Sequence, residues 1–142
     1  MPTIAIRKQL GVSAGAVWAT LADFGNVEWI PGAGDVVVEG DGPGMQRVLA
    51  GGGPTPIVEK LLWIEHATRK LCYEITDNPL PVGRFVAVAT VSDGGTDSGG
   101  STVAWEVDFE PDGDEDAARG AIEAVYGLMA GWIEDYVRAA DQ

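Results

Sequence analysis

Positive charge is scarce in this sequence. Nine Lys and Arg residues stand against 22 Asp and Glu residues, and the formal net charge is −13. A chain with this imbalance repels both the phosphates of nucleic acids and the anionic surface of a lipid bilayer. We therefore expect no nucleic-acid partner. Long apolar runs are missing as well: no segment approaches the ~18 consecutive apolar residues of a transmembrane helix, so membrane insertion is not expected.

Cysteine is almost absent. Cys72 is the only one, so the chain forms no internal disulfide and no thiolate metal cluster, and its folding does not depend on an oxidising compartment. The amino-terminal residues also lack the long apolar stretch of a secretory signal. These absences predict a cytoplasmic protein.

The rest of the composition is that of a globular protein. The chain has 142 residues, of which 46% are hydrophobic and 22% charged, close to the averages for folded domains. This length suits one domain with one hydrophobic core. We expect residues 1–142 to form that single domain.

Apolar and alternating runs predict the secondary structure. We expect a strand over 3–10, a helix that begins after the N-cap residue Ser13, and a second short helix or turn over 26–30 that ends before Pro31. The connections between the later β-rich runs are too short for crossover helices, which predicts an antiparallel meander. Those runs, bounded by Gly, Pro, Asn or Asp, are 35–39, 44–50, 56–65, 71–76, 85–92 and 101–110.

The last segment, 114–140, has the clearest helical pattern. Its apolar residues recur at spacings of three and four, and acidic residues stand at its amino end, where they complement the helix dipole. Only the concave face of a curved sheet is large enough to cover such a stripe. The sequence therefore predicts an α+β fold: a curved antiparallel seven-stranded sheet around a long carboxy-terminal helix, with two short helices after the first strand.

One hairpin of the predicted sheet brings two charged residues together. An antiparallel register across its glycine-rich turn sets Arg47 opposite Glu59. The same face also carries Leu49, Ile57, Leu61 and Trp63. An ion pair in such apolar surroundings costs desolvation free energy and is seldom kept for stability alone. Two alternatives stay open: the other face of the hairpin is also rather apolar, and a surface ion pair worth only ~0–1 kcal/mol fits the same residues.

Several segments resemble a known superfamily. Residues 23–31 resemble the Asp-Phe…Trp-x-Pro signature of the polyketide cyclase/dehydrase-like branch of the Bet v 1-like (START-like, SRPBCC) superfamily, and residues 44–47 resemble its Gly-x-x-Arg strand. Segments 59–62, 73–78 and 105–107 are similar to lachrymatory-factor-synthase-like relatives. The resemblance implies a helix-grip fold, in which the terminal helix crosses a half-open barrel and the wedge between them holds a ligand-sized cavity.

The resemblance also implies roles for the charged pair. In the lachrymatory-factor-synthase-like relatives, an arginine and a glutamate at the positions matching Arg47 and Glu59 point into the cavity and transfer protons. We therefore treat Glu59 as a candidate general base or acid, and Arg47 as a group that stabilises developing negative charge. This chain departs from those relatives at Phe85, where they use a tyrosine.

These observations predict a protein that binds a small, largely apolar molecule in an internal cavity. It either catalyses cyclisation, dehydration or isomerisation without an external cofactor, or acts as a non-catalytic carrier or sensor; an interaction module with a filled core is a third alternative. The sequence is compatible with a homodimer as well as with a monomer. The residues expected to line the cavity are Trp29, Leu49, Ile57, Leu61, Tyr73, Ile75, Phe85, Ala87, Val125, Tyr126 and Met129, of which the tyrosines also fit as ordinary core residues.

No metal site is expected. Acidic residues between 112 and 123 have the spacing of a calcium-binding loop, but Ala117 stands where that loop needs glycine, and capping of the terminal helix explains the same residues. His66, the only histidine, lies at the end of a predicted strand with no second soft ligand near it in the sequence.

Overall fold

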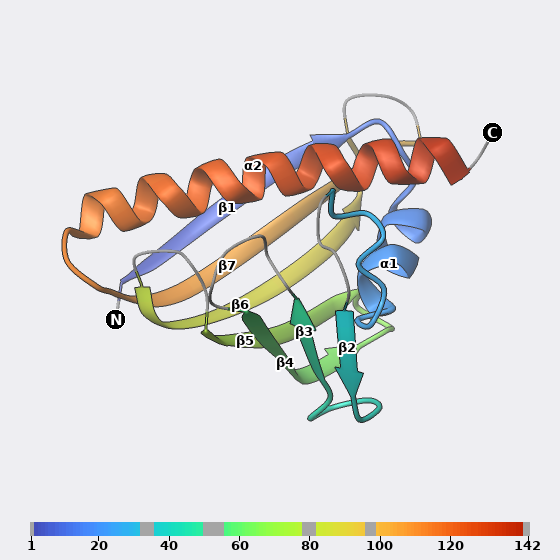
Figure 1. The fold of residues 1–142 in the computed structure, drawn as a ribbon. Helices are drawn as coiled ribbons and strands as arrows, with labels where there is room; N and C mark the ends of the chain where they lie inside the picture. The colour runs from blue at the N-terminus through green and yellow to red at the C-terminus, as the bar shows by residue number, and fades with distance from the viewer. Residues whose placement is uncertain (1, 32–35, 50–55, 78–81, 96–98, 141–142) are drawn as a thin grey trace.

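The computed structural model describes residues 2–31, 36–49, 56–77, 82–95 and 99–140 (Figure 1). Its elements in chain order are β1 (Thr3–Leu10), α1 (Ala14–Ala22), β2 (Val36–Glu39), β3 (Gln46–Leu49), β4 (Ile57–Glu65), β5 (Lys70–Asp77), β6 (Val82–Asp93), β7 (Ser101–Pro111) and α2 (Glu115–Ala140). The turn between β3 and β4 lies outside the described residues.

The strands form one antiparallel sheet of seven strands in the order β1-β7-β6-β5-β4-β3-β2. Apart from β1, which pairs with β7, neighbours in the sheet are neighbours in the sequence, as short connections require. The sheet curves, and α2 lies across its concave side (Figure 1). The predicted α+β helix-grip architecture is confirmed in these respects.

The long helix α2 begins at a side-chain cap and buries one stripe. The backbone N–H of Ala117 donates to Asp114 Oδ2 at 3.0 Å, so Asp114 satisfies one of the unpaired donors at the helix start. The buried stripe consists of Ala118, Ile122, Tyr126, Ala130, Ile133 and Val137. It packs against β1, β7 and α1. The sheet curls away from α2 towards β3 and β2, and we call the region between them the wedge (Figure 1).

Of the two alternatives expected over 26–30, a short helix or a turn, the structure has the turn, so the expectation of two short helices after the first strand is wrong. In the described residues, helix α1, capped by the Ser13 hydroxyl as predicted, is the only helix between β1 and β2. Residues 26–30 form turns instead, because the Asn26 side chain accepts a hydrogen bond from the backbone N–H of Glu28 and Pro31 leaves too few residues for a helix to propagate. We call residues 23–31 the strap, since they run from α1 across the wedge.

Strand β4 contains two irregularities that the sequence did not reveal. Its register against β5 shifts between Val58 and Glu59 and again between Leu61 and Trp63. At the second shift, Trp63 pairs with Cys72 and not with a residue of the inner face. Trp63 is consequently 39% exposed, and its expected place beside Arg47 and Glu59 is wrong.

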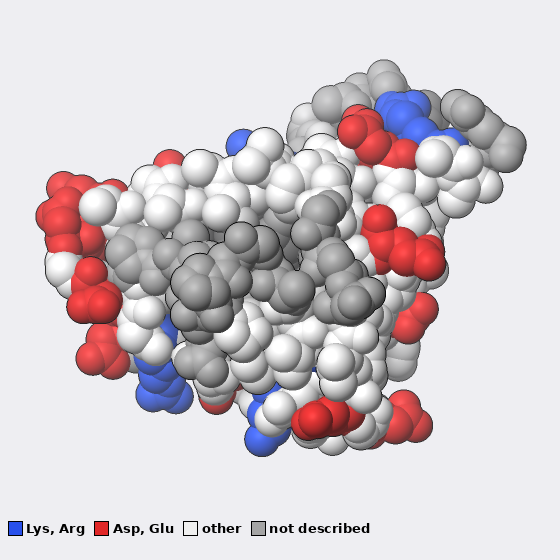
Figure 2. All heavy atoms as spheres, viewed as in Figure 1, with Lys and Arg blue, Asp and Glu red and all other residues white. Residues whose placement is uncertain are grey.

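The surface reflects the acidic composition. Figure 2 shows Asp and Glu side chains around the rim of one face, including a group at the end where α2 begins; the first turn of that helix carries Glu115 and Asp116. Within the described residues, no helix has the length and apolar character needed to cross a bilayer.

Candidate functional site

The site is built around an ion pair between two neighbouring strands. Arg47 of β3 lies opposite Glu59 of β4, and Arg47 Nε donates to Glu59 Oε1 at 2.5 Å. Only 6% of Arg47 and 9% of Glu59 are exposed. The predicted cross-strand pair is therefore confirmed, and its burial rules out the alternative of a surface ion pair. The attraction between such buried charges must offset the loss of their hydration.

The Arg47 guanidinium also holds the strap. Its Nη1 donates to the backbone carbonyl of Phe24 at 2.7 Å, and its central carbon lies 4.0 Å from the centre of the Phe24 ring. The ring face carries negative electrostatic potential, which favours a cation there. One charged side chain thus connects β4, through Glu59, to the segment that closes the wedge.

The other end of the strap contacts α2 weakly. Asn26 Nδ2 donates to Tyr136 Oη at 3.3 Å, and that hydroxyl donates to Glu28 Oε2 at 3.4 Å. Both distances exceed the usual range for hydrogen bonds of these kinds. The strap residue Trp29, whose indole N–H donates to the carbonyl of Asn26 at 3.1 Å, is nevertheless buried.

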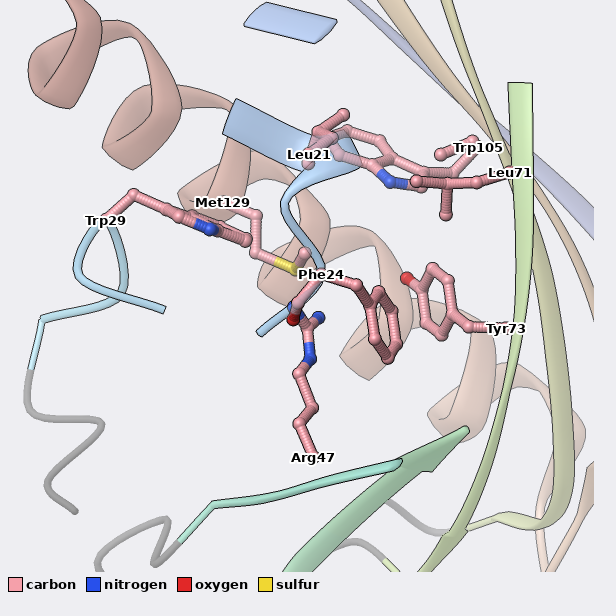
Figure 3. Close-up of a pocket in the computed structure, with 9 residues that line it drawn as sticks. Leu21, Phe24, Trp29, Arg47, Leu71, Tyr73, Trp105 and Met129 are labelled. Atoms are coloured by element: carbon pink, nitrogen blue, oxygen red, sulfur yellow. The ribbon is translucent and has the colours of Figure 1, made fainter. Parts of the chain in front are cut away.

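A small pocket lies where the strap, the sheet and α2 meet (Figure 3). It is lined by Leu21, Phe24, Trp29, Arg47, Leu71, Tyr73, Ala89, Trp105 and Met129. Its cavity volume is about 10 Å³, which is room for about one water molecule. This pocket falls short of the ligand-sized cavity expected from the sequence, because aromatic side chains and Met129 fill the wedge.

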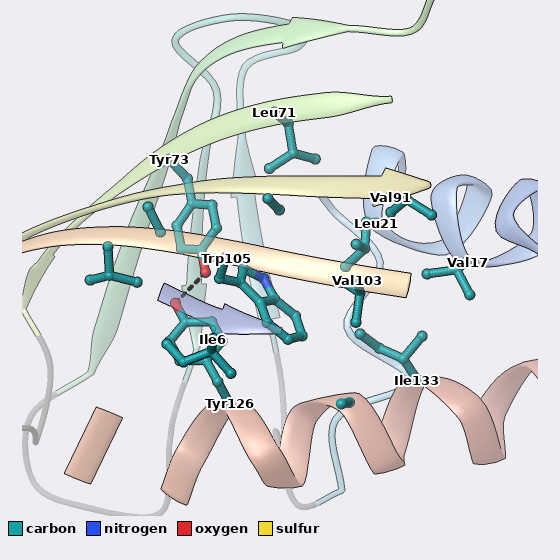
Figure 4. Packing of buried hydrophobic residues seen from close by; sticks show 14 of the residues in the cluster. Ile6, Val17, Leu21, Leu71, Tyr73, Val91, Val103, Trp105, Tyr126 and Ile133 are labelled. Carbon is teal, nitrogen blue, oxygen red and sulfur yellow. Dashed lines mark hydrogen bonds between the residues drawn. The ribbon is translucent and has the colours of Figure 1, made fainter. Parts of the chain in front are cut away.

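Two tyrosines meet on the inner side of the sheet. The hydroxyl oxygens of Tyr73 on β5 and Tyr126 on α2 lie 2.5 Å apart (Figure 4). Burial raises the pKa of both hydroxyls above the ordinary tyrosine value, and the Glu59 carboxylate raises both pKa values further. Both groups are therefore neutral at physiological pH.

The structure brings together part of the predicted set. Trp29, Arg47, Tyr73 and Met129 line the pocket. The others lie around it or farther away. Leu61, Ile75, Phe85, Ala87 and Tyr126 are buried in the same core; Glu59 is buried as the hydrogen-bonded partner of Arg47; Leu49 belongs to a smaller cluster with Val27, against which Ile57 also packs; and Val125 is only half-buried. Their ligand-binding roles stay predictions.

Sequence reasoning missed several lining residues. Phe24 stands in the quoted signature segment, and Ala89 shares a strand face with Ala87, so both carried a signal. Trp105 alternates with Val103 and Val107 on the inner face of β7, a pattern that indicates burial but not a pocket.

The remaining chemistry-bearing residues have structural surroundings. His66 lies in the turn after β4, with its ring edge-on to Trp18 at 5.6 Å between ring centres. Cys72 is buried, and burial raises the pKa of its thiol. Within the described part of the chain, no cluster of three or more His, Cys, Asp or Glu side chains has the arrangement of a metal site.

Solved structures with the same fold share little sequence with this chain. XoxI from Bacillus cereus is 22% identical, with a TM-score of 0.84, over 100% of this chain and 99% of that one. Ara h 8.0201 is 20% identical with a TM-score of 0.78, over 97% and 98% of the two chains. Norcoclaurine synthase from Thalictrum flavum, solved with dopamine and hydroxybenzaldehyde, is 16% identical with a TM-score of 0.72, over 97% and 87%. These likenesses show the fold.

A comparison with curated proteins gave no match. The family model described as "Polyketide cyclase / dehydrase and lipid transport" matches residues 1–140, nearly the whole chain. This match confirms the resemblance of the signature segments to the polyketide cyclase/dehydrase-like branch. The chain belongs to the polyketide cyclase/dehydrase and lipid-transport family.

Proposed function

We propose that this protein binds a small, largely apolar molecule between the strap, α2 and the concave face of the sheet, with the polar end of that molecule at Arg47. One observation carries the proposal: Arg47 is a buried cation that lines a pocket whose other walls are apolar and aromatic. Within the described residues, only its Nε and Nη1 donate hydrogen bonds. A guanidinium has five N–H donors, so donors remain for a ligand.

The structure is a closed form under this proposal, and entry requires displacement of side chains. Met129 suits this role because its unbranched side chain adopts several shapes at little cost. The strap suits it as well, because its hydrogen bonds to α2 through Tyr136 are long. Ligand binding would then move Met129 and the part of the strap after Phe24, while the sheet, Arg47 and its bond to Phe24 stay in place.

Thermal unfolding with two small probes tests this proposal. Acetophenone and α-methylstyrene are uncharged molecules of nearly the same shape. A bound probe raises the free energy of unfolding by about 2.7 kcal/mol at a hundred times its Kd. We expect a rise in Tm for the wild type, loss of that rise in Met129→Trp, which fills the pocket, and its retention in Leu128→Trp.

Leu128→Trp is the matched control, because Leu128 is the next residue of the same helix but is exposed. If neither probe raises the Tm of the wild type, or if Met129→Trp responds as the wild type does, the proposal is wrong. A filled interaction module would give the first of these results.

Acid–base catalysis by Glu59 is a second candidate function. Among the described residues only its Oε1 is hydrogen-bonded, so Oε2 is available as a proton acceptor. A general base must reach the proton that it removes within hydrogen-bond distance or through one water. Glu59 is not among the residues that line the pocket, which makes binding the first proposal.

Exchange of the acetophenone methyl protons with D₂O separates the two candidates. A catalytic Glu59 would accelerate this enolisation above the buffer rate, and Glu59→Gln would remove the acceleration while the probe still binds. A carrier or sensor would bind acetophenone and leave the exchange at the buffer rate.

A further inference from the structure

The hydroxyl pair of Tyr73 and Tyr126 has one more hydrogen-bond donor than it uses. Each tyrosine carries one O–H. The contact between the two hydroxyl oxygens consumes one of the two protons. Within the described residues this contact is the only hydrogen bond of either hydroxyl, so the second proton is directed at some other acceptor. A buried donor without an acceptor costs about 1–3 kcal/mol.

The surroundings indicate which tyrosine offers that second proton. The ring of Tyr126 is enclosed, stacked parallel to Phe85 at 6.2 Å and lying 4.8 Å from Trp105. Tyr73 is a lining residue of the pocket, whereas Tyr126 is not. Figure 3 shows the Tyr73 hydroxyl directed into the space between Phe24 and Met129. If Tyr126 donates to Tyr73, the Tyr73 proton faces the pocket.

The electrostatics of the pair favour a neutral acceptor. The Glu59 carboxylate raises the pKa of both tyrosines more than the Arg47 guanidinium lowers it, so the ion pair imposes a net negative potential at the two hydroxyls. An anionic group beside them would meet that potential in a dry site, where charge repulsion is strong. A carbonyl oxygen accepts a hydrogen bond without carrying a full charge.

We propose that Tyr73 donates a hydrogen bond to the bound ligand, and that the ligand is a neutral molecule with an acceptor oxygen of the carbonyl type, in preference to a hydrocarbon or a carboxylate. This inference rests on the proposed function, because it concerns the occupant of the same pocket. It gives the ligand two polar points, one at Arg47 and one at Tyr73, with aromatic walls between them.

Three probes of similar shape test the inference. Acetophenone has a neutral carbonyl, α-methylstyrene has a CH₂ in place of that oxygen, and benzoate has a carboxylate. Dissociation constants are measured by isothermal titration calorimetry at neutral pH. One net hydrogen bond makes acetophenone bind about three- to tenfold more tightly than α-methylstyrene. Benzoate is expected to bind more weakly than acetophenone.

Tyrosine-to-phenylalanine variants locate the donor. Tyr73→Phe should lower the preference for acetophenone over α-methylstyrene about three- to tenfold, because it removes the lining hydroxyl and little volume while Arg47 remains. Tyr126→Phe should keep a preference, because the Tyr73 hydroxyl remains. Thr68→Val is the control: it removes an exposed hydroxyl in the turn after β4, outside the pocket, and should keep the full preference.

The possible failures are distinguishable. Equal binding of acetophenone and α-methylstyrene by the wild type would overturn the inference and leave the proposed function intact. An unchanged preference in Tyr73→Phe, or tighter binding of benzoate than of acetophenone, would also overturn it. If no probe binds the wild type, the proposed function fails and this inference fails with it.

Discussion

Removing the Arg47 side chain should destabilise the protein far more than removing any surface cation. Arg47→Met deletes the 2.5 Å contact with Glu59, the 2.7 Å hydrogen bond to the Phe24 carbonyl and the contact with the Phe24 ring. It leaves the Glu59 carboxylate buried without its counter-charge. Loss of one partner from a buried ion pair costs about 3–5 kcal/mol. Because the bond to the strap is lost as well, we expect the free energy of unfolding to fall by an amount in the upper part of that range.

A double variant separates the lost pair from the stranded charge. In Arg47→Met/Glu59→Leu both charges are gone, and buried pairs replaced by apolar residues are often neutral or stabilising. We therefore expect the double variant to recover most of the loss caused by Arg47→Met alone. Urea unfolding followed by tryptophan fluorescence at pH 7 measures both values.

Arg138→Met is the control for this experiment. Arg138 is paired with Glu134 at 3.8 Å on the exposed side of α2, with half of its side chain accessible to solvent. Exposed pairs contribute about 0–1 kcal/mol, so this variant should unfold almost as the wild type does. If Arg47→Met also costs less than 1 kcal/mol, or if the double variant is no more stable than the single one, Arg47 and Glu59 are not the buried, coupled pair described above.

Three further predictions follow from other parts of the structure. Burial raises the pKa of Tyr73 and Tyr126, so the stability due to their neutral forms is complete below pH ~10 and falls at higher pH by up to about 1.4 kcal/mol per pH unit per tyrosine; in Tyr136→Phe, tyrosinate absorbance should rise only together with unfolding, and a rise in the folded protein would contradict this. Asp114→Ala should cost about 1 kcal/mol in urea unfolding because it removes the cap of α2; an unchanged midpoint would show that the cap is not formed in solution. Met129→Ala should lower the Tm of the free protein yet tighten acetophenone binding, since it enlarges the pocket; weaker binding in calorimetry would place the probe elsewhere.

The register of the β3–β4 hairpin could be predicted because side chains alternate strictly along a strand. Once the turn was placed, the parity of the positions put Arg47 opposite Glu59 and on one face with Leu49. The shift between Leu61 and Trp63 broke this parity later in the same strand. Such an irregularity depends on how the strand bends around the core, and the residue types near it do not predict it.

The site itself depends on contacts between segments far apart in the sequence. The Tyr73–Tyr126 pair is 53 residues apart and requires the rotation of α2 about its axis relative to β5, which helical periodicity fixes only coarsely. The strap was recognisable from its signature residues, but its turns are set by the Asn26 side chain and by the Arg47 bond to Phe24. The small size of the pocket follows from the packing of Phe24, Trp29 and Met129, which a pattern of apolar residues does not reveal.

The most direct test of ligand binding in this pocket is an NMR titration of the ¹⁵N-labelled protein with acetophenone, observed at the side-chain N–H signals of tryptophan and arginine. We predict that the signals of Trp29, Trp105 and Arg47 Nε shift and saturate together, while the signal of Trp63 on the outer face stays unchanged. Shifts confined to Trp63, or no saturable shift at any of these groups, would contradict ligand binding in this pocket.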